Sequence, residues 1–312
     1  MAINNRVTQM MGMQYPIIQA PMGWIARSQL ASAVSAAGGL GMIETSSGEN
    51  DAIVEEIRKM KTLTDKPFCV NIAQAFIRDP SIIDMIIAEG VKTVTTSAGS
   101  PKKFTKVLKE AGLNVFHVVP TLEAAQKAVD AGVDGLIVEG GEGGGFKNPK
   151  DVSTMVLLPL VRSKLDVPLI AAGGICDGAT MAAAFALGAE GVQMGTRMVS
   201  ALESPVHQNW KQAIVDAPDT GTVMIKPNGP GAALRALRTE TSEALERGEG
   251  NPMATLGGGV KQVYFEGKLE DGLALTGQVA GRIEAVEPVA TIIERTMQEF
   301  EDTLSKLSST YL

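Results

Sequence analysis

Cysteine, histidine and clusters of basic residues are all scarce in this 312-residue chain. Its two cysteines, Cys69 and Cys176, lie in apolar, strand-like contexts without metal-ligand spacing, so neither a disulfide framework nor a thiolate metal site is expected. Only two histidines occur and carboxylates do not recur at ligand spacing, so the sequence predicts no metal site. The net charge of −7, without a basic block, argues against nucleic acid as a standing partner.

Long apolar runs are also absent. No run is long enough to span a membrane, and residues 1–15 lack the apolar segment behind basic residues that is typical of a signal peptide. We therefore expect a soluble, cytoplasmic protein with reduced thiols and no membrane partner. The chain also lacks low-complexity tracts and linkers, which argues against independent domains.

What the sequence has in abundance is short apolar segments that alternate with helical stretches. This rhythm favours an α/β fold, a (β/α)8 TIM barrel. A doubly wound sheet is the alternative, but its glycine-rich turn normally follows the first strand. The expected strands are residues 16–20, 40–43, 67–70, 91–95, 115–119, 135–139, 167–172 and 191–194. The expected helices between them are residues 28–37, 51–61, 81–88, 101–111, 122–131, 154–164 and 179–187.

The rhythm stops after Thr196. The following segment has helical pieces at 208–215 and 232–246, separated by Gly/Pro-rich joints at 227–231 and 248–259. We interpret residues 200–285 as a helical subdomain inserted after the eighth strand and covering the barrel mouth. Residues 1–199 and 286–312 then form the barrel, and 287–307 form its closing amphipathic helix.

Glycine-rich loops follow the sixth, seventh and eighth expected strands, at 140–145, 173–174 and 195. In TIM barrels, ligands bind at the carboxyl ends of the strands, and phosphate is commonly held after strands seven and eight. Backbone N–H groups at Gly173, Gly174 and Gly195, with the Thr196 hydroxyl, can therefore cradle a phosphate. The alternative is that these glycines only permit tight turns and that 140–145 is a flexible surface loop.

Several segments together resemble the nitronate monooxygenase (2-nitropropane dioxygenase-like) family. This family includes flavin-dependent enoyl-[acyl carrier protein] reductases and some NADH:quinone reductases. The segments are PIIQAPM at 16–22, AGGLG at 37–41, DKPFCVN at 65–71, AAGGI at 171–175, QMGTR at 193–197 and TGQVAG at 276–281. The resemblance covers nearly the whole chain and implies a TIM barrel with FMN bound non-covalently at its mouth.

The resemblance also implies roles for individual residues. It aligns the flavin ring with Ala20, Pro21 and Met22, gives its polar edge to Asn71, and makes Gly144 a point of close approach. Glu139 stands where the family has Gln or Glu near the flavin and is a catalytic candidate. The residues implied around the ribityl phosphate are Gly173, Gly174, Gln193, Met194, Gly195 and Thr196.

One departure from the family concerns the residue that accepts or donates a proton during the reaction. Phe146 stands where many members have the His that acts as base or acid, and phenylalanine can do neither. His117, within the fifth expected strand, could replace that His if it faces the lumen, although a strand histidine is more often a hydrogen-bonded core group.

The resemblance implies an FMN-dependent oxidoreductase that oxidises small nitronates with O2. The alternative is an NAD(P)H-dependent reductase of an enoyl thioester or a quinone, which Glu139 and the stretch 118–121 favour. A flavin-free sugar-phosphate barrel, or a relative that only binds FMN, belongs to a different class. Arg235 and Arg238, one helical turn apart in the expected subdomain, could attract a dinucleotide or carrier phosphate or simply be solvated. A homodimer is a candidate assembly.

Overall fold

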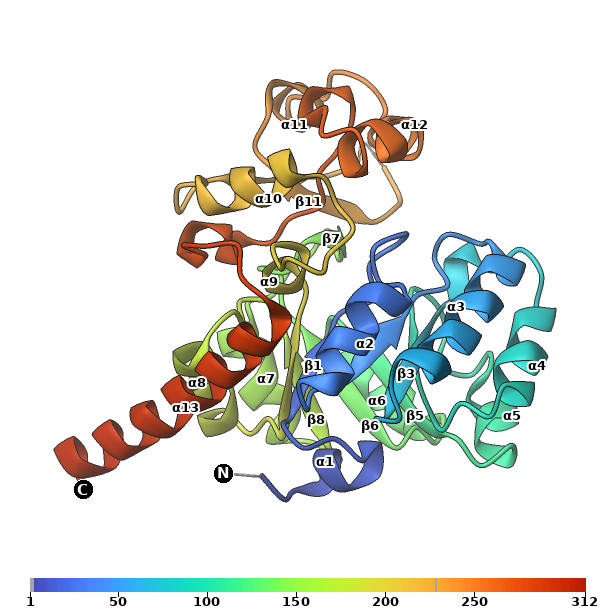
Figure 1. The fold of residues 1–312 in the computed structure, drawn as a ribbon, viewed down its shortest axis with the longest axis vertical. Helices are drawn as coiled ribbons and strands as arrows, with labels where there is room; N and C mark the ends of the chain where they lie inside the picture. The colour runs from blue at the N-terminus through green and yellow to red at the C-terminus, as the bar shows by residue number, and fades with distance from the viewer. Residues whose placement is uncertain (1–2, 228) are drawn as a thin grey trace.

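The computed structural model describes residues 3–227 and 229–312, and eight parallel strands form a barrel at its centre (Figure 1). The strand order is β1-β9-β8-β6-β5-β4-β3-β2, and a bridge between Ile18 and Leu40 joins the first strand to the last. The strands are β1 (Ile17–Gln19), β2 (Gly41–Ile43), β3 (Phe68–Ala73), β4 (Thr93–Ser97), β5 (Asn114–Val119), β6 (Gly135–Glu139), β8 (Leu169–Ala172) and β9 (Gly191–Met194). The predicted (β/α)8 TIM barrel is therefore confirmed.

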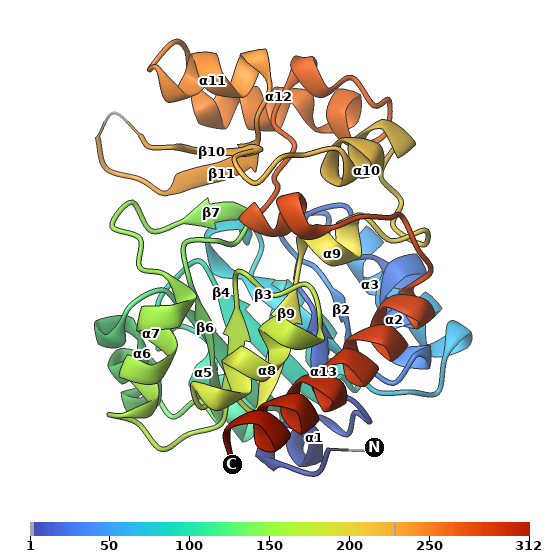
Figure 2. The ribbon, with the colours of Figure 1, turned by 90° about the vertical axis from the view of Figure 1, so that its left-hand side faces the viewer.

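Helices cover the outside of the barrel because each has one apolar face. In α3, for example, Ile53, Ile57 and Met60 are buried at helical spacing, while the charged Arg58 and Lys59 between them are exposed. The surrounding helices are α2 (Ser28–Ala36), α3 (Asn50–Leu63), α4 (Ser81–Ala88), α5 (Thr105–Glu110), α6 (Leu122–Asp130), α7 (Thr154–Arg162), α8 (Gly178–Ala186) and α13 (Val289–Tyr311). The closing helix α13 packs beside α8, as Figure 2 shows. Among the described residues, no helix combines the length and apolar character that crossing a membrane requires.

Alternation along the strands divides the core into a lumen and an outer layer. Ile18, Met42, Phe116 and Ile137 form one apolar cluster inside the barrel. Their sequence neighbours belong to a second cluster between the strands and the helices. The N-terminal helix α1 (Arg6–Met11), which the sequence did not indicate, contributes Val7 and Met11 to the lumen cluster and so fills the lower end of the barrel.

The remaining elements lie at the end of the barrel where the strands finish (Figures 1 and 2). They include a three-stranded antiparallel sheet of order β10-β11-β7. Its strand β7 (Gly145–Lys147) belongs to the loop after β6, so the barrel and the later segment share one sheet. The elements are α9 (Thr196–Val199), α10 (Gln208–Val215), β10 (Thr222–Ile225), β11 (Ala233–Leu237), α11 (Glu240–Glu246), α12 (Pro252–Tyr264) and the 3-10 turns η1 (Gln74–Phe76), η2 (Leu269–Asp271) and η3 (Gln278–Arg282).

Two predictions for this segment were wrong. Residues 232–246 are not one helix: 233–237 form β11, because pairing with β10 and β7 overrides the helical propensity of Ala and Leu. Residues 252–264 form α12 where a Gly/Pro-rich joint was expected, since Pro252 occupies the helix start and Asn251 caps it. In the other joint, residue 228 lies outside the described residues. Treating 200–285 as a separate subdomain remains a prediction.

Candidate functional site

Three polar side chains face the lumen near the carboxyl ends of its strands. Asn71 follows the lumen-facing Cys69, Glu139 follows Ile137, and Gln193 lies between the outward-facing Val192 and Met194. The Asn71 amide donates to Thr95 Oγ1 at 2.9 Å. Gln193 is 5% exposed, and its Oε1 has no hydrogen-bond partner. Because a buried polar atom is normally satisfied, this orphaned oxygen is suited to a ligand donor.

The predicted phosphate loops lie next to Gln193. Gly173 and Gly174 follow β8 with φ of +88° and +80°, which are conformations that favour glycine. Gly195 follows β9, and the Thr196 hydroxyl accepts the Gly277 N–H at 2.8 Å, which leaves its own hydrogen free to donate.

The end of β1 adjoins these loops. The Ala20 N–H donates to Met194 O at 2.9 Å, and a Cβ at Gly195 would lie 3.5 Å from the Ala20 Cβ. Pro21 and the half-buried Met22 continue from there, and the Met22 carbonyl accepts two N–H groups of the next turn. Donors, an orphaned acceptor and side-chain-free walls are thus brought together, and this set fits a phosphorylated flat cofactor.

The glycine loop 140–145 is anchored rather than freely mobile. The Glu142 carboxylate accepts the Thr154 N–H at 2.9 Å. The Thr154 hydroxyl has one proton, and the acceptors within its reach include the Glu142 carboxylate at 3.0 Å and the Gly173 carbonyl oxygen at 2.8 Å. A Cβ at Gly144 would lie 2.8 Å from backbone atoms of 276–277, so the close approach that Gly144 permits is to that segment. Glu142 and Thr154 had no signal of their own in the sequence.

An ion pair that sequence reasoning missed stands at the end of β6. Lys147, on β7, contacts the Glu139 carboxylate, and their side chains are 4% and 26% exposed respectively. A Cβ at Gly143 would lie 2.8 Å from the Lys147 Nζ and 3.0 Å from the Glu139 Oε1, so a larger residue there would displace the charged ends of the pair. The sequence carried no signal for this pair, because β7 forms only by pairing with β11.

Phe146 points the other way. It pairs in register with Leu234 and packs on the apolar cluster of the small sheet. Its ring also meets Phe76 edge to face, with centroids 5.2 Å apart. The residue at the family's His position therefore packs with apolar side chains on the sheet face opposite to Lys147.

His117 does not meet the condition for acid/base work. Its neighbours Phe116 and Val118 pack in the lumen cluster, so the imidazole faces the helix layer, where Nδ1 lies 2.6 Å from Thr96 Oγ1. Burial lowers the pKa of His117 to about 4, so the ring is neutral at physiological pH. This geometry is that of a hydrogen-bonded core histidine.

Arg235 differs from its prediction as well. It lies on β11 instead of a helix, is 7% exposed, and donates from Nε to Gly141 O at 2.8 Å. It therefore ties the small sheet to the glycine loop. Arg238 is separate from it and pairs with Glu243 at the surface.

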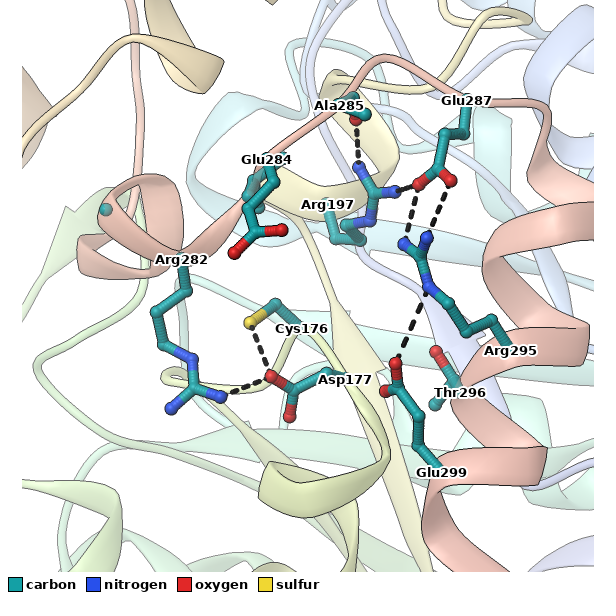
Figure 3. A pocket seen from close by; sticks show the side chains of 12 residues that line it. Cys176, Asp177, Arg197, Arg282, Glu284, Ala285, Glu287, Arg295, Thr296 and Glu299 are labelled. Atoms are coloured by element: carbon teal, nitrogen blue, oxygen red, sulfur yellow. Dashed lines mark hydrogen bonds and ion pairs between the residues drawn. The ribbon is translucent and has the colours of Figure 1, made fainter.

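A hollow of about 580 Å3 lies outside the barrel lumen, beside α13 (Figure 3). Arg282 pairs with Asp177 there, and Arg197 pairs with Glu287, so these cations are neutralised. Burial raises the pKa of the Cys176 thiol to about 12, which keeps it protonated and unreactive. Within the described residues, no group of three or more His, Cys, Asp or Glu side chains could hold a metal ion.

Known proteins resemble this chain along most of its length. The family model for nitronate monooxygenase matches residues 4–76 and 74–299. FabK from Thermotoga maritima is 40% identical, with a TM-score of 0.92 over 98% of this chain and 99% of that one. A Mycobacterium tuberculosis protein named (3aS,4S,5R,7aS)-5-hydroxy-7a-methyl-1-oxo-octahydro-1H-indene-4-carboxyl-CoA dehydrogenase is 38% identical over 80% of this chain and 70% of its own length. The nitronate monooxygenase of Pseudomonas aeruginosa is 30% identical over 80% of this chain and 81% of its own length. The chain therefore belongs to the nitronate monooxygenase family of flavin-dependent oxidoreductases.

Proposed function

We propose that this protein binds FMN at the barrel mouth and uses it to exchange electrons between NAD(P)H and a CoA- or carrier-bound thioester. The observation that carries the cofactor assignment is the orphaned Oε1 of Gln193 beside the glycine-walled ends of β8 and β9. When bound, FMN would supply the hydride chemistry. The protein would supply a flat slot, backbone donors at Gly174 and Gly195, and polar groups at Asn71 and Gln193.

The thioester substrate is supported by the relatives and by Phe146. The M. tuberculosis relative is named for a carboxyl-CoA substrate, and FabK has a TM-score of 0.92 with this chain. Because residue 146 is Phe, the site lacks the imidazole base that would deprotonate a neutral nitroalkane. The Phe146 ring packs on the face opposite to Lys147. This order reverses the expectation from the sequence, which ranked nitronate oxidation first.

The cofactor is tested by mass spectrometry of the small molecule released from the purified protein. We expect FMN, and FAD or no flavin would contradict the assignment. Replacing Gly174 with Ala should weaken FMN retention, because a non-glycine residue at φ +80° costs roughly 1–2 kcal/mol and displaces the loop. Stoichiometric FMN in folded Gly174→Ala would mean that this loop does not hold it.

The reaction is tested by anaerobic stopped flow in two halves. NADH or NADPH should bleach the flavin, and crotonyl-CoA should then restore its absorbance. Bleaching by neither nucleotide would contradict the reductase proposal.

The second candidate is oxidation of nitronates with O2, which the 30% identical P. aeruginosa enzyme favours. A nitronate is already deprotonated and needs no base, so Phe146 does not exclude it. We expect ethylnitronate to be oxidised more efficiently than neutral nitroethane. Efficient oxidation of nitroethane would reveal a base in the native protein.

A further inference from the structure

The unexplained pair in this site is Lys147 and Glu139. Glu139 ends β6 on the lumen face, and Lys147 reaches it from β7 across the side-chain-free Gly143. Lys147 is almost fully buried, whereas the Glu139 side chain keeps 26% of its surface. A molecule in the lumen mouth would therefore meet the carboxylate first, with the ammonium group directly behind it.

The Lys147–Glu139 ion pair is not needed to hold the small sheet on the barrel. Arg235 already ties the small sheet to the glycine loop through Gly141 O, and Phe146 ties it to Phe76. Burying a charged pair is costly and gives little net stability compared with apolar packing. A pair retained at the carboxyl end of a barrel strand, where the active sites of TIM barrels lie, is better explained by chemistry.

We propose that Lys147 is the proton source of this site and that Glu139 passes the proton between Lys147 and the substrate carbon. The inference rests on the proposed thioester reaction. There the C=C bond of an enoyl thioester gains a hydride equivalent, which NAD(P)H supplies, at one carbon and a proton at the carbon next to the carbonyl. The N–H bond of Lys147 breaks as the Glu139 carboxyl forms, and the O–H bond of Glu139 breaks as the C–H bond forms. Solvent then protonates the more exposed Glu139 carboxylate, which returns that proton to the buried Lys147 amine.

Replacing Lys147 with Arg separates charge from proton transfer. Arginine keeps the cation beside Glu139 but does not give up its proton in proteins. In Lys147→Arg and Lys147→Met, we expect crotonyl-CoA reoxidation to slow by roughly 10²–10⁴-fold, the contribution of a positioned acid, while bleaching by NAD(P)H is unchanged. Glu139→Gln, which keeps the shape but cannot carry a proton, should lose as much.

Ligand binding gives a readout that is independent of turnover. Acetoacetyl-CoA, which ionises to an enolate at alkaline pH, should under those conditions bind Lys147→Met about tenfold more weakly than it binds the parent and Lys147→Arg about equally, because the arginine keeps the charge. FMN content and circular dichroism identify variants that fold. Lys150→Met, which removes an exposed cation from the same loop, is the matched control and should behave like the parent.

The outcomes separate the two proposals. A parent protein that does not pass electrons to crotonyl-CoA contradicts the proposed function and the role of Lys147 with it. If the parent reacts and folded Lys147→Met reacts equally fast, the proton-source role of Lys147 is wrong while the proposed function stands. If Lys147→Arg recovers the parent rate, the lysine acts only through its charge and the proton-transfer role is wrong.

Discussion

The two faces of the β10-β11-β7 sheet differ in the side chains they carry and in what those side chains contact. The face toward the glycine loop carries Lys147 and Arg235, which are both buried. Lys147 contacts Glu139 at the end of β6, and Arg235 donates to the Gly141 carbonyl of the loop. The opposite face carries Phe146, Leu234 and Val223, which pack on α11 and α12 side chains such as Leu245 and Leu256. Residues adjacent in sequence, Phe146 and Lys147, thus belong to different environments.

The difference shows that one small sheet can both stabilise the segment and supply side chains to the candidate site. Its apolar face holds the segment together, while its polar face presents cations to the end of β6. Because strand side chains alternate strictly, one strand can serve both purposes without compromise. Substitutions on the apolar face should therefore change stability, and substitutions on the polar face should change the site.

The largest expected effect is on the apolar face. Leu234→Ala removes a side chain that is 1% exposed and should lower the free energy of unfolding by roughly 2–5 kcal/mol. Urea unfolding measures this loss, and the flavin content of the folded variant should stay the same. Leu202→Ala is the control, since that leucine is 55% exposed and should change stability by less than about 0.5 kcal/mol. Equal losses of unfolding free energy in both variants would contradict a stabilising role for the apolar face of the sheet.

In the glycine loop beside the polar face, Gly143→Ala should impair the reaction and spare the fold. Its Cβ would lie 2.8 Å from the Lys147 Nζ, and a flexible side chain can move away. A displacement of about 1 Å in a reacting group can cost roughly 10²-fold in rate. In Gly144→Ala the Cβ meets backbone at 2.8 Å, so that variant should lose stability instead. Thermal melting together with crotonyl-CoA turnover distinguishes the two.

Arg235→Met should have a smaller effect, on the link between sheet and loop. It leaves the Gly141 carbonyl without its donor, which costs roughly 1–3 kcal/mol when the group stays buried. Denaturant unfolding gives the value. Arg247→Met is a matched change at a side chain that is 58% exposed, and it should have almost no effect. A loss in Arg247→Met as large as in Arg235→Met would contradict the assigned link.

Phe146→His is expected to have the smallest effect. The imidazole would take the face that the phenyl ring takes, beside Leu234 and Phe76 and away from Glu139. Nitroethane turnover should therefore rise far less than the roughly 10²–10⁴-fold that a positioned base contributes. A gain within that range would show that residue 146 reaches the substrate.

Much of the architecture could be predicted from the sequence. Apolar segments that end in glycine or a polar residue located all eight barrel strands, because strands buried on both faces are short continuous apolar runs. The same rhythm located the carboxyl ends of β6, β8 and β9, where the glycine loops lie. Family resemblance added Asn71, Glu139 and Gln193, which the structure brings to one end of the lumen, although their roles remain predictions.

The tertiary structure alone decided which side chains surround these residues. The strand β7 is three residues long and has no apolar signal of its own, since it exists only by pairing with β11, which lies about ninety residues later. For that reason the sequence could not reveal that Lys147 faces Glu139 while Phe146 faces away. The orientation of His117 was also undecided until alternation around Phe116 fixed it. Local pattern specifies which segments form strands, but long-range pairing specifies which side chains meet, and the chemistry of this site depends on the second.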